Sequence, residues 1–107
     1  MTHSTAVGPV AVTRDRNGFW THPRYFKPAG DEASRADFNN WLRRNNLVCA
    51  LCWLENDAPP HVTDAWEHGA CDISEWQPSM PAGEGWFTGS IHDTEDGPVC
   101  VWLREAP

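Results

Sequence analysis

Residues 86–104 have the sequence Trp86-Phe87-Thr88-Gly89-Ser90-Ile91-His92-Asp93-Thr94-Glu95-Asp96-Gly97-Pro98-Val99-Cys100-Val101-Trp102-Leu103-Arg104. Two segments of strand length, residues 86–92 and 99–104, flank the polar stretch from Asp93 to Pro98. Asp, Gly and Pro are the residues that tight turns between strands favour. This region therefore predicts an antiparallel β-hairpin.

A further segment, residues 47–54, is continuously apolar from Leu47 to Leu54. An uninterrupted apolar run of this length is typical of a strand with both faces buried, so we expect it at the centre of the sheet. The segment from Val10 to Arg14 predicts a short edge strand, and Asn17-Gly18 predicts a turn after it.

The clearest helix signal precedes the apolar run. Phe38, Trp41 and Leu42 lie at positions i, i+3 and i+4, which places them on one helix face. Ser34 is a good N-cap residue, and the pair Asn45-Asn46 suits a left-handed C-cap. These features predict the main helix at residues 35–45, and Pro59-Pro60 predicts a short helix at residues 60–69.

These elements together predict an α+β fold. We expect a small antiparallel sheet of three or four strands that is covered by the main helix, on one face, plus the short helix. The chain of 107 residues fits one domain, so we expect a compact domain at residues 10–107 and a flexible tail at residues 1–9.

The net charge of −7 is unevenly distributed. Residues 1–54 contain seven basic and four acidic side chains, whereas residues 55–107 contain eleven acidic side chains and one base, Arg104. Direct nucleic-acid binding is not expected, because it depends on a surplus of Lys and Arg. The acidic half either keeps a Trp-rich protein soluble or offers a surface to a basic partner.

The N-terminal residues lack the basic segment and apolar core of a secretory signal. No apolar run approaches the length of about 20 residues that spans a bilayer. We therefore expect a cytoplasmic protein that does not bind membranes, and in that compartment disulfides are rare.

Two kinds of site can be weighed from the residues. Cys49, Cys52, His68 and Cys71 have the spacing of a tetrahedral zinc site. However, residues 49 and 52 of a strand point to opposite faces, and buried cysteines often act as small apolar residues. We therefore predict no metal and no cofactor, and keep a zinc-supported structural domain as an alternative.

Ser90 and His92 lie two residues apart, hence on one face of a strand, and Asp93 follows them. No nucleophile elbow or oxyanion-hole motif surrounds this trio, so we predict no catalytic residues. A small accessory enzyme remains the less favoured alternative.

Two stretches, Gly18 to Pro23 and Gly83 to Arg104, resemble a group of small, mostly uncharacterised proteins that tailed bacteriophages and prophages of proteobacteria encode. The resemblance implies a phage accessory protein made in the cytoplasm of its bacterial host. By analogy of class, it also implies an anti-defence role such as that of anti-CRISPR proteins.

The residues suggest how such an inhibitor would act. Acidic side chains of the C-terminal half would enter a basic channel of a host protein or nucleoprotein complex, where they would mimic a nucleic-acid backbone, and tryptophans would serve as apolar anchors. The predicted partner-binding residues are Glu75, Trp76, Glu84, Trp86, Asp93, Glu95 and Asp96.

Overall fold

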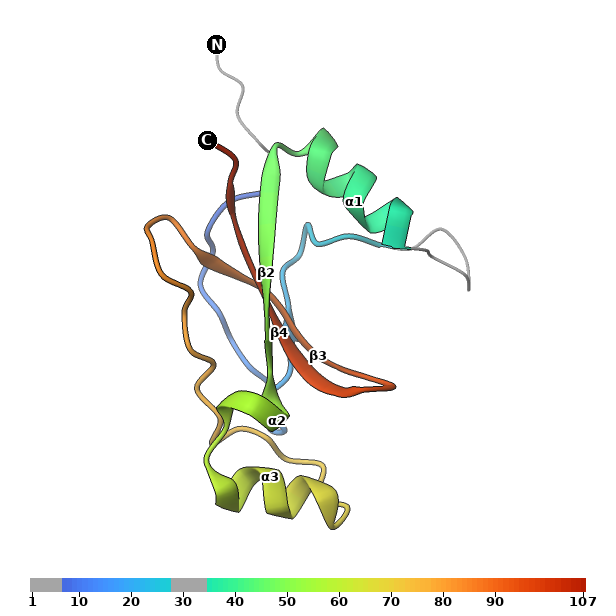
Figure 1. Cartoon of the computed structure of the whole chain (residues 1–107), viewed down its shortest axis with the longest axis vertical. Coiled ribbons are helices and arrows are strands. Elements are labelled where there is room, and N and C mark those ends of the chain that lie inside the picture. Colours follow the sequence, from blue (N-terminus) through green and yellow to red (C-terminus); the bar gives the residue numbers. More distant parts are fainter. Residues whose placement is uncertain (1–6, 28–34) are drawn as a thin grey trace.

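A computed structural model describes residues 7–27 and 35–107 (Figure 1). It confirms the predicted α+β class, with a four-stranded antiparallel sheet and short helices. The elements in chain order are β1 (Trp20–Thr21), α1 (Arg35–Arg44), β2 (Leu47–Trp53), α2 (Leu54–Asp57), α3 (Pro60–Glu67), β3 (Phe87–Thr94) and β4 (Gly97–Glu105).

The predicted hairpin forms the middle of the sheet. The strand order is β1-β3-β4-β2, and β3 joins β4 through a turn at Glu95 and Asp96. Gly97, the first residue of β4, has a φ of 105°, a left-handed value that glycine adopts without steric cost. The side chain of Thr94 supports the turn because its hydroxyl accepts a hydrogen bond from the Asp96 N–H at 3.0 Å.

The prediction of a central strand at residues 47–54 is wrong. β2 lies at an edge of the sheet with β4 as its strand partner, and Leu51 in its middle is 53% exposed. The central position belongs to β4, in which every residue from Pro98 to Leu103 is buried. A continuous apolar run indicates that both faces of a strand are covered by other elements. It does not indicate whether the strand pairs with one neighbouring strand or with two.

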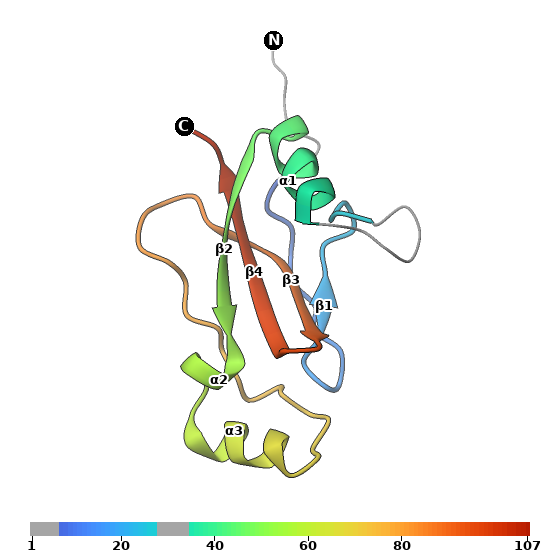
Figure 2. The same cartoon turned by 45° about the vertical axis from the view of Figure 1, so that its right-hand side comes forward.

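Two hydrophobic clusters lie on opposite faces of the sheet, whose strand order can be followed in Figure 2. The first contains Trp41 and Leu42 of α1 with Val99, Val101 and Leu103 of β4. On the other face, the alternate β4 residues pack against α2, α3 and the loop after α3. The sheet is thus covered on both faces: α1 covers one face, as predicted, and α2, α3 and the loop after α3 cover the other.

The loop between α3 and β3 contributes two buried side chains to this second layer. Ile73 and Trp76 are 0% and 1% exposed, so this part of the loop belongs to the core. Arg14 ties the N-terminal segment to it, since its guanidinium donates hydrogen bonds to the carbonyl oxygens of Trp76 at 2.6 Å and Ile73 at 3.1 Å.

The first part of the chain differs from prediction in detail. Residues 10–14 form no strand, and the edge strand is β1. The turn at Asn17-Gly18 forms as expected, with the Gly18 N–H donating to the Asp15 carbonyl at 2.9 Å. Of the predicted tail, residues 1–6 lie outside the described residues, whereas Val7 is 3% exposed and belongs to the first cluster.

The helices form close to their predicted positions. α1 ends one residue earlier than expected, and Asn46 has the left-handed φ of 56° that its C-cap role requires. Ser34, the predicted N-cap, lies outside the described residues. α3 ends at Glu67, two residues early, and the single turn of α2 was not predicted. Within the described ranges, none of the helices combines the length and hydropathy that crossing a bilayer requires.

A register shift between Thr88 and Ser90 changes which residues face α1. Phe87 lies opposite Leu103 and Ser90 lies opposite Val101, so Gly89 is the extra residue of a β-bulge. Because of this bulge, Ser90 and His92 share the α1-facing side with Phe87. A side chain at Gly89 would have no room, since a Cβ there would lie 2.7 Å from Cδ1 of Leu103.

We therefore expect Gly89→Ala to destabilise the domain by about 1–3 kcal/mol, because Leu103 must move within a packed core. Urea denaturation monitored by tryptophan fluorescence measures this change. Gly8→Ala is the matched control, since a Cβ at Gly8 meets no atom within 4 Å. An effect of Gly89→Ala no larger than that of Gly8→Ala would contradict a steric role for the bulge glycine.

Candidate functional site

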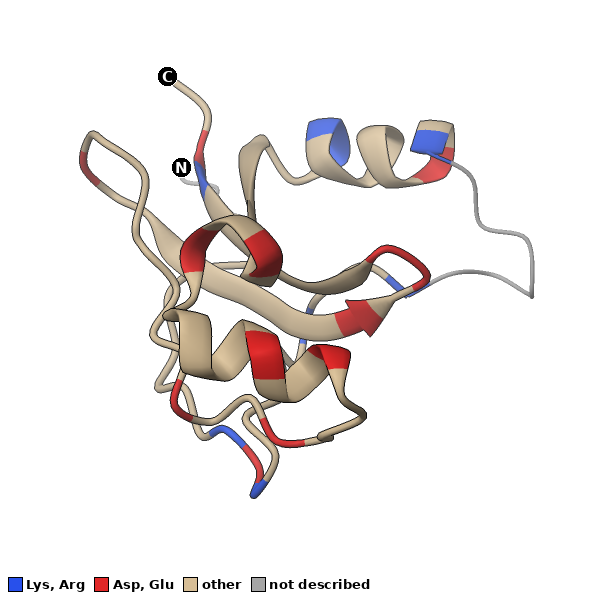
Figure 3. Cartoon of the chain, turned by 60° about the horizontal axis from the view of Figure 1, so that its bottom comes forward, with Lys and Arg blue, Asp and Glu red and all other residues tan. Residues whose placement is uncertain are grey.

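Acidic side chains gather at the end of the molecule formed by α2, α3 and the β3–β4 turn (Figure 3). Six exposed carboxylates belong to what we call the acidic end: Glu55, Asp64, Glu67, Asp93, Glu95 and Asp96. Residues 55–103 contain no Lys or Arg. Within the described ranges, none of the six makes a salt bridge. Their charges therefore add up at this end of the molecule.

Three separate elements meet at the acidic end. Glu55 of α2, Glu67 of α3 and Asp96 of the β3–β4 turn surround one small hollow of about 100 Å³. Leu54, Trp66 and Pro98 contribute apolar surface to the same hollow. An apolar floor with carboxylates around it suits the aliphatic stem and charged head of a Lys or Arg side chain.

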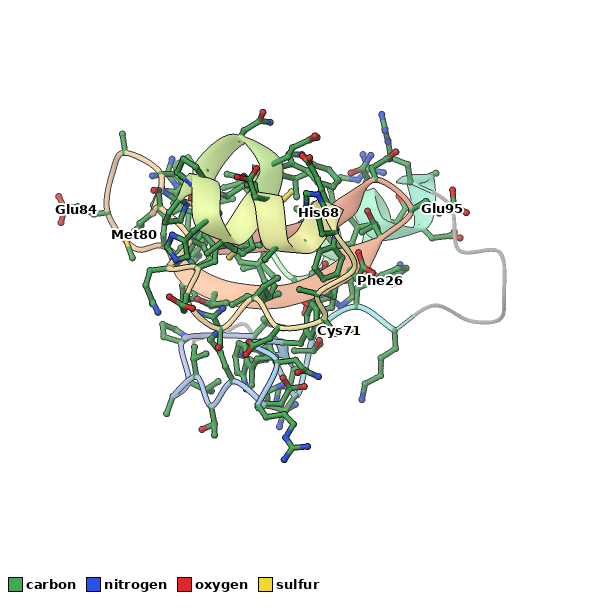
Figure 4. The ribbon with its side chains drawn as sticks, turned by 90° about the horizontal axis from the view of Figure 1, so that it is seen from below. Phe26, His68, Cys71, Met80, Glu84 and Glu95 are labelled. Atoms are coloured by element: carbon green, nitrogen blue, oxygen red, sulfur yellow. The ribbon has the colours of Figure 1, made fainter. Side chains whose placement is uncertain are left out.

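The structure brings together three of the seven predicted partner-binding residues. Asp93, Glu95 and Asp96 lie together at the β3–β4 turn and are exposed. Glu84 lies at the opposite side of the molecule from Glu95 (Figure 4). Glu75 is also apart from the turn and lies 3.1 Å from Nε2 of His61 in α3.

The two predicted tryptophan anchors differ in exposure. Trp76 is buried, and its Nε1–H donates to Oδ2 of Asp57 at 2.9 Å, so it offers no surface to a partner. Burial opposes ionisation of Asp57, but hydrogen bonds from Ser79 and Trp76 outweigh that effect and hold the pKa of its carboxyl below the ordinary value. Trp86 is half-buried, and the Arg104 guanidinium lies 4.6 Å from its ring centre.

Sequence reasoning missed Glu55, Asp64, Glu67 and the half-buried Trp66. Asp64 and Glu67 are three residues apart in a helix that was predicted, so their common face was a usable signal. No pattern in the sequence placed Glu55 on a helix face, because α2 was not predicted. Its proximity to Asp96 depends on how α2 packs against the end of the hairpin.

The zinc alternative is not supported by the positions of its four candidates. Cys49 packs in the first hydrophobic cluster and Cys52 in the second, so β2 directs them to opposite faces. Cys71 and His68 are exposed, and Nδ1 of His68 is 2.7 Å from the Asp64 carbonyl oxygen of its own helix. Within residues 7–27 and 35–107, no group of three or more His, Cys, Asp or Glu side chains could hold a metal ion.

A groove of about 540 Å³ lies between α1 and the sheet. Its aromatic residues are Tyr25, Phe26, Phe38 and Trp53, and its floor includes Val99 and Val101 of β4. Ring contacts hold the aromatic wall together, since the ring centres of Phe26 and Phe38 are 5.5 Å apart. The volume is within the range of small-molecule sites.

A chain of hydrogen bonds crosses the floor of this groove. The hydroxyl of Ser90 lies 2.9 Å from Oγ1 of Thr21 and 2.8 Å from Nδ1 of His92. Burial lowers the pKa of His92, while Asp93 acts in the opposite direction. The imidazole is therefore neutral near pH 7.

The predicted trio of Ser90, His92 and Asp93 does not form a hydrolase triad. Asp93 is exposed and, by strand alternation, points to the other face from His92. None of the described groove residues carries a carboxylate. In serine hydrolases a carboxylate binds Nδ1 and the serine binds Nε2, whereas here the serine lies at Nδ1.

No family model, curated protein or solved structure matches this chain.

The lowered pKa of His92 makes stability depend on pH. Above its ordinary pKa of 6.5, His92 is neutral in both the folded and the unfolded chain. Below that value the unfolded chain binds the proton first, so the free energy of unfolding falls as the pH drops towards the folded pKa. We expect wild type to lose more stability between about pH 8 and about pH 5.5 than His92→Gln does.

Urea denaturation at the two pH values measures this difference, and the contributions of other titrating groups cancel in the comparison. The midpoint at which the carbon-bound ring protons of His92 titrate gives an independent check. A midpoint at or above 6.5 would contradict the burial of a neutral imidazole.

Proposed function

We propose that the protein is a phage-encoded, non-enzymatic inhibitor that binds a basic, nucleic-acid-handling defence complex of its bacterial host through the acidic end. The observation that carries this proposal is the hollow at which Glu55, Glu67 and Asp96 meet from three elements. The resemblance of the hairpin region to phage proteins supplies the biological setting.

Electrostatics supports a basic partner. Carboxylates with no opposing Lys or Arg in residues 55–103 create a negative potential over the acidic end. Such a surface attracts a groove that is lined with Lys and Arg and normally holds phosphates. The half-buried Trp66 adds apolar contact next to the charges, and it replaces the buried Trp76 as the tryptophan at this surface.

The proposed test combines three charge reversals in one variant: Asp93→Lys, Glu95→Lys and Asp96→Lys. All three residues are exposed at the turn, so folding should be preserved. We expect binding to the target complex to weaken at least about tenfold, because attraction becomes repulsion. The measurement is surface plasmon resonance against purified, guide-loaded CRISPR effector complexes and other DNA-binding defence complexes.

The matched control is Glu84→Lys, which reverses an exposed charge away from the acidic end. It should bind like wild type. Wild-type affinity should also fall as salt is raised, because salt screens exposed charges. Full affinity of the triple variant, or absence of binding to every complex tested, would overturn the proposed function.

The groove favours a second candidate function, the binding of a small molecule. Arg35 is the one charged side chain among its described lining residues, and the walls are aromatic. A planar aromatic molecule with one anionic group would match this surface, with its ring against Phe38 and Trp53 and its anion near Arg35. The neutral ring of His92 and the hydroxyl of Ser90 would provide hydrogen-bonding groups.

We expect 8-anilinonaphthalene-1-sulfonate, an anion with a planar naphthalene ring system, to bind the folded domain with increased fluorescence. Arg35→Gln should weaken binding by about threefold or more, because an ionic hydrogen bond is lost. Arg16→Gln, at another exposed arginine, is the control and should have no effect. Equal binding by the two variants would contradict an anion site in the groove.

A further inference from the structure

The pairing of β2 with β4 brings two cysteines together. The two strands run side by side, and in their antiparallel register Cys52 lies directly opposite Cys100 (Figure 2). Both side chains pack in the second hydrophobic cluster, so they lie on the same face of the sheet. Cys49 of the same strand packs in the first cluster, on the other face. All four cysteines of the chain are thiols, and the sheet register places two of them next to each other.

The spacing of this pair suits a disulfide. In an antiparallel ladder, pairs that exchange two backbone hydrogen bonds alternate with pairs that exchange none. The Ala106 N–H donates to the Asn46 carbonyl at 2.8 Å, and the register runs unbroken along β2 to Cys52, an even number of positions further. Cys52 and Cys100 are therefore a hydrogen-bonded pair, in which the Cα atoms are about 5.5 Å apart. Most disulfides join Cα atoms that are about 5.5–6 Å apart.

The edge position of β2 helps the bond to form. The Cβ atoms of directly opposed residues must approach each other by about 1 Å to reach the separation found in disulfides. Within the described ranges, β2 has a strand partner on one side only. A second ladder that would oppose this small movement is therefore absent from the described part of the sheet.

The two thiols differ in access. Cys100 is 0% exposed, whereas Cys52 is half-buried, and its thiol donates a hydrogen bond to the carboxylate of Asp57. A small oxidant such as hydrogen peroxide reaches a half-buried sulfur more easily than a buried one. The first oxidation therefore takes place at Cys52, and Cys100 is the neighbouring thiol that can react with the product.

We propose that Cys52 and Cys100 are a modification site at which hydrogen peroxide forms a disulfide between β2 and β4. The Cys52 thiolate attacks one peroxide oxygen, the O–O bond breaks and hydroxide leaves, so that Cys52 becomes a sulfenic acid. The Cys100 thiolate then attacks the Cys52 sulfur, the S–O bond breaks and a second hydroxide leaves. The two protons released by the thiols convert both hydroxides to water. Two thiols thus lose two electrons, and one peroxide is reduced to two waters.

The disulfide changes the contacts of the edge strand. It joins β2 covalently to the central strand, and it removes the thiol that donates to Asp57. The carboxylate of Asp57 still accepts hydrogen bonds from Nε1 of Trp76 at 2.9 Å and from the Ser79 N–H at 3.0 Å. Because thiol reductants cleave disulfides, the crosslink is reversible.

Burial makes the reaction slow at neutral pH. It raises the pKa of Cys52 to about 11, with the hydrogen bond to Asp57 adding to the effect, and the pKa of Cys100 to about 12. The thiolate is the nucleophile, so the rate of crosslinking should rise about tenfold per pH unit between about pH 7 and about pH 9. The site therefore responds to sustained exposure to peroxide and not to a brief pulse.

The test uses the full chain with Cys71→Ser, which removes the exposed cysteine that could crosslink two copies. After treatment with hydrogen peroxide, we expect one of the three remaining thiols, Cys49, to react with a thiol reagent. Residues 55–103 contain no Lys or Arg, so digestion after Glu rather than with trypsin separates the two halves of the pair for mass spectrometry. The spectrum should contain a peptide pair joined through Cys100, and dithiothreitol should restore all three thiols.

Two further variants in the same background identify the partner of Cys100. Cys52→Ala should abolish the crosslink, whereas Cys49→Ala, the matched control on the other face of the same strand, should preserve it. Three reactive thiols after treatment, a crosslink that survives Cys52→Ala, or oxygen addition without a crosslink would overturn the proposal. The chain with Cys71→Ser keeps both cysteines of the pair, so its thiol count does not depend on how the alanine variants fold.

The disulfide proposal does not depend on the proposed function. Asp93, Glu95 and Asp96 are unchanged in every variant of this test, and the triple reversal of those residues leaves both cysteines unchanged. Failure of one proposal can thus be distinguished from failure of the other.

Discussion

β4 must bury side chains on both of its faces while it forms backbone hydrogen bonds to a strand on each side. Its residues Pro98 to Leu103 are all buried, so each face of the sheet needs its own cover. α1 with the N-terminal segment covers one face, and α2, α3 and the loop with Ile73 and Trp76 cover the other. The arrangement of the remaining elements, including the position of the acidic end and of the groove, follows from this double burial.

The bulge at Gly89 shows how one backbone irregularity determines the chemistry of a surface. It directs Ser90 and His92 to the α1 side, where they form a hydrogen-bonded row with Thr21 across two strands. Without the bulge, strand alternation would direct Ser90 and His92 to the face of the sheet opposite to that of Phe87. The polar floor of the groove therefore depends on a glycine at which a side chain would collide with Leu103 and crowd the carbonyl oxygen of Val101.

The sequence predicts the location of the acidic surface only in part. The surplus of acids in residues 55–107 is a property of composition, but the fold disperses Glu75 and Glu84 and gathers Asp93, Glu95 and Asp96. It also adds Glu55 and Glu67 from helices that pack near the turn. Linear clustering identified the charged half of the chain, whereas the members of the surface depended on packing between elements.

The sequence by itself determined the α+β class, the hairpin at residues 86–104, helix α1 and its Asn46 cap, because local periodicity and turn chemistry act over a few residues. It also placed Cys49 and Cys52 on opposite faces through strand alternation. Only the tertiary structure decided that β4 and not β2 is central, that Trp76 is core, and that Glu55, Glu67 and Asp96 meet. Strand order and the approach of distant segments depend on long-range packing, which no local pattern of residues encodes.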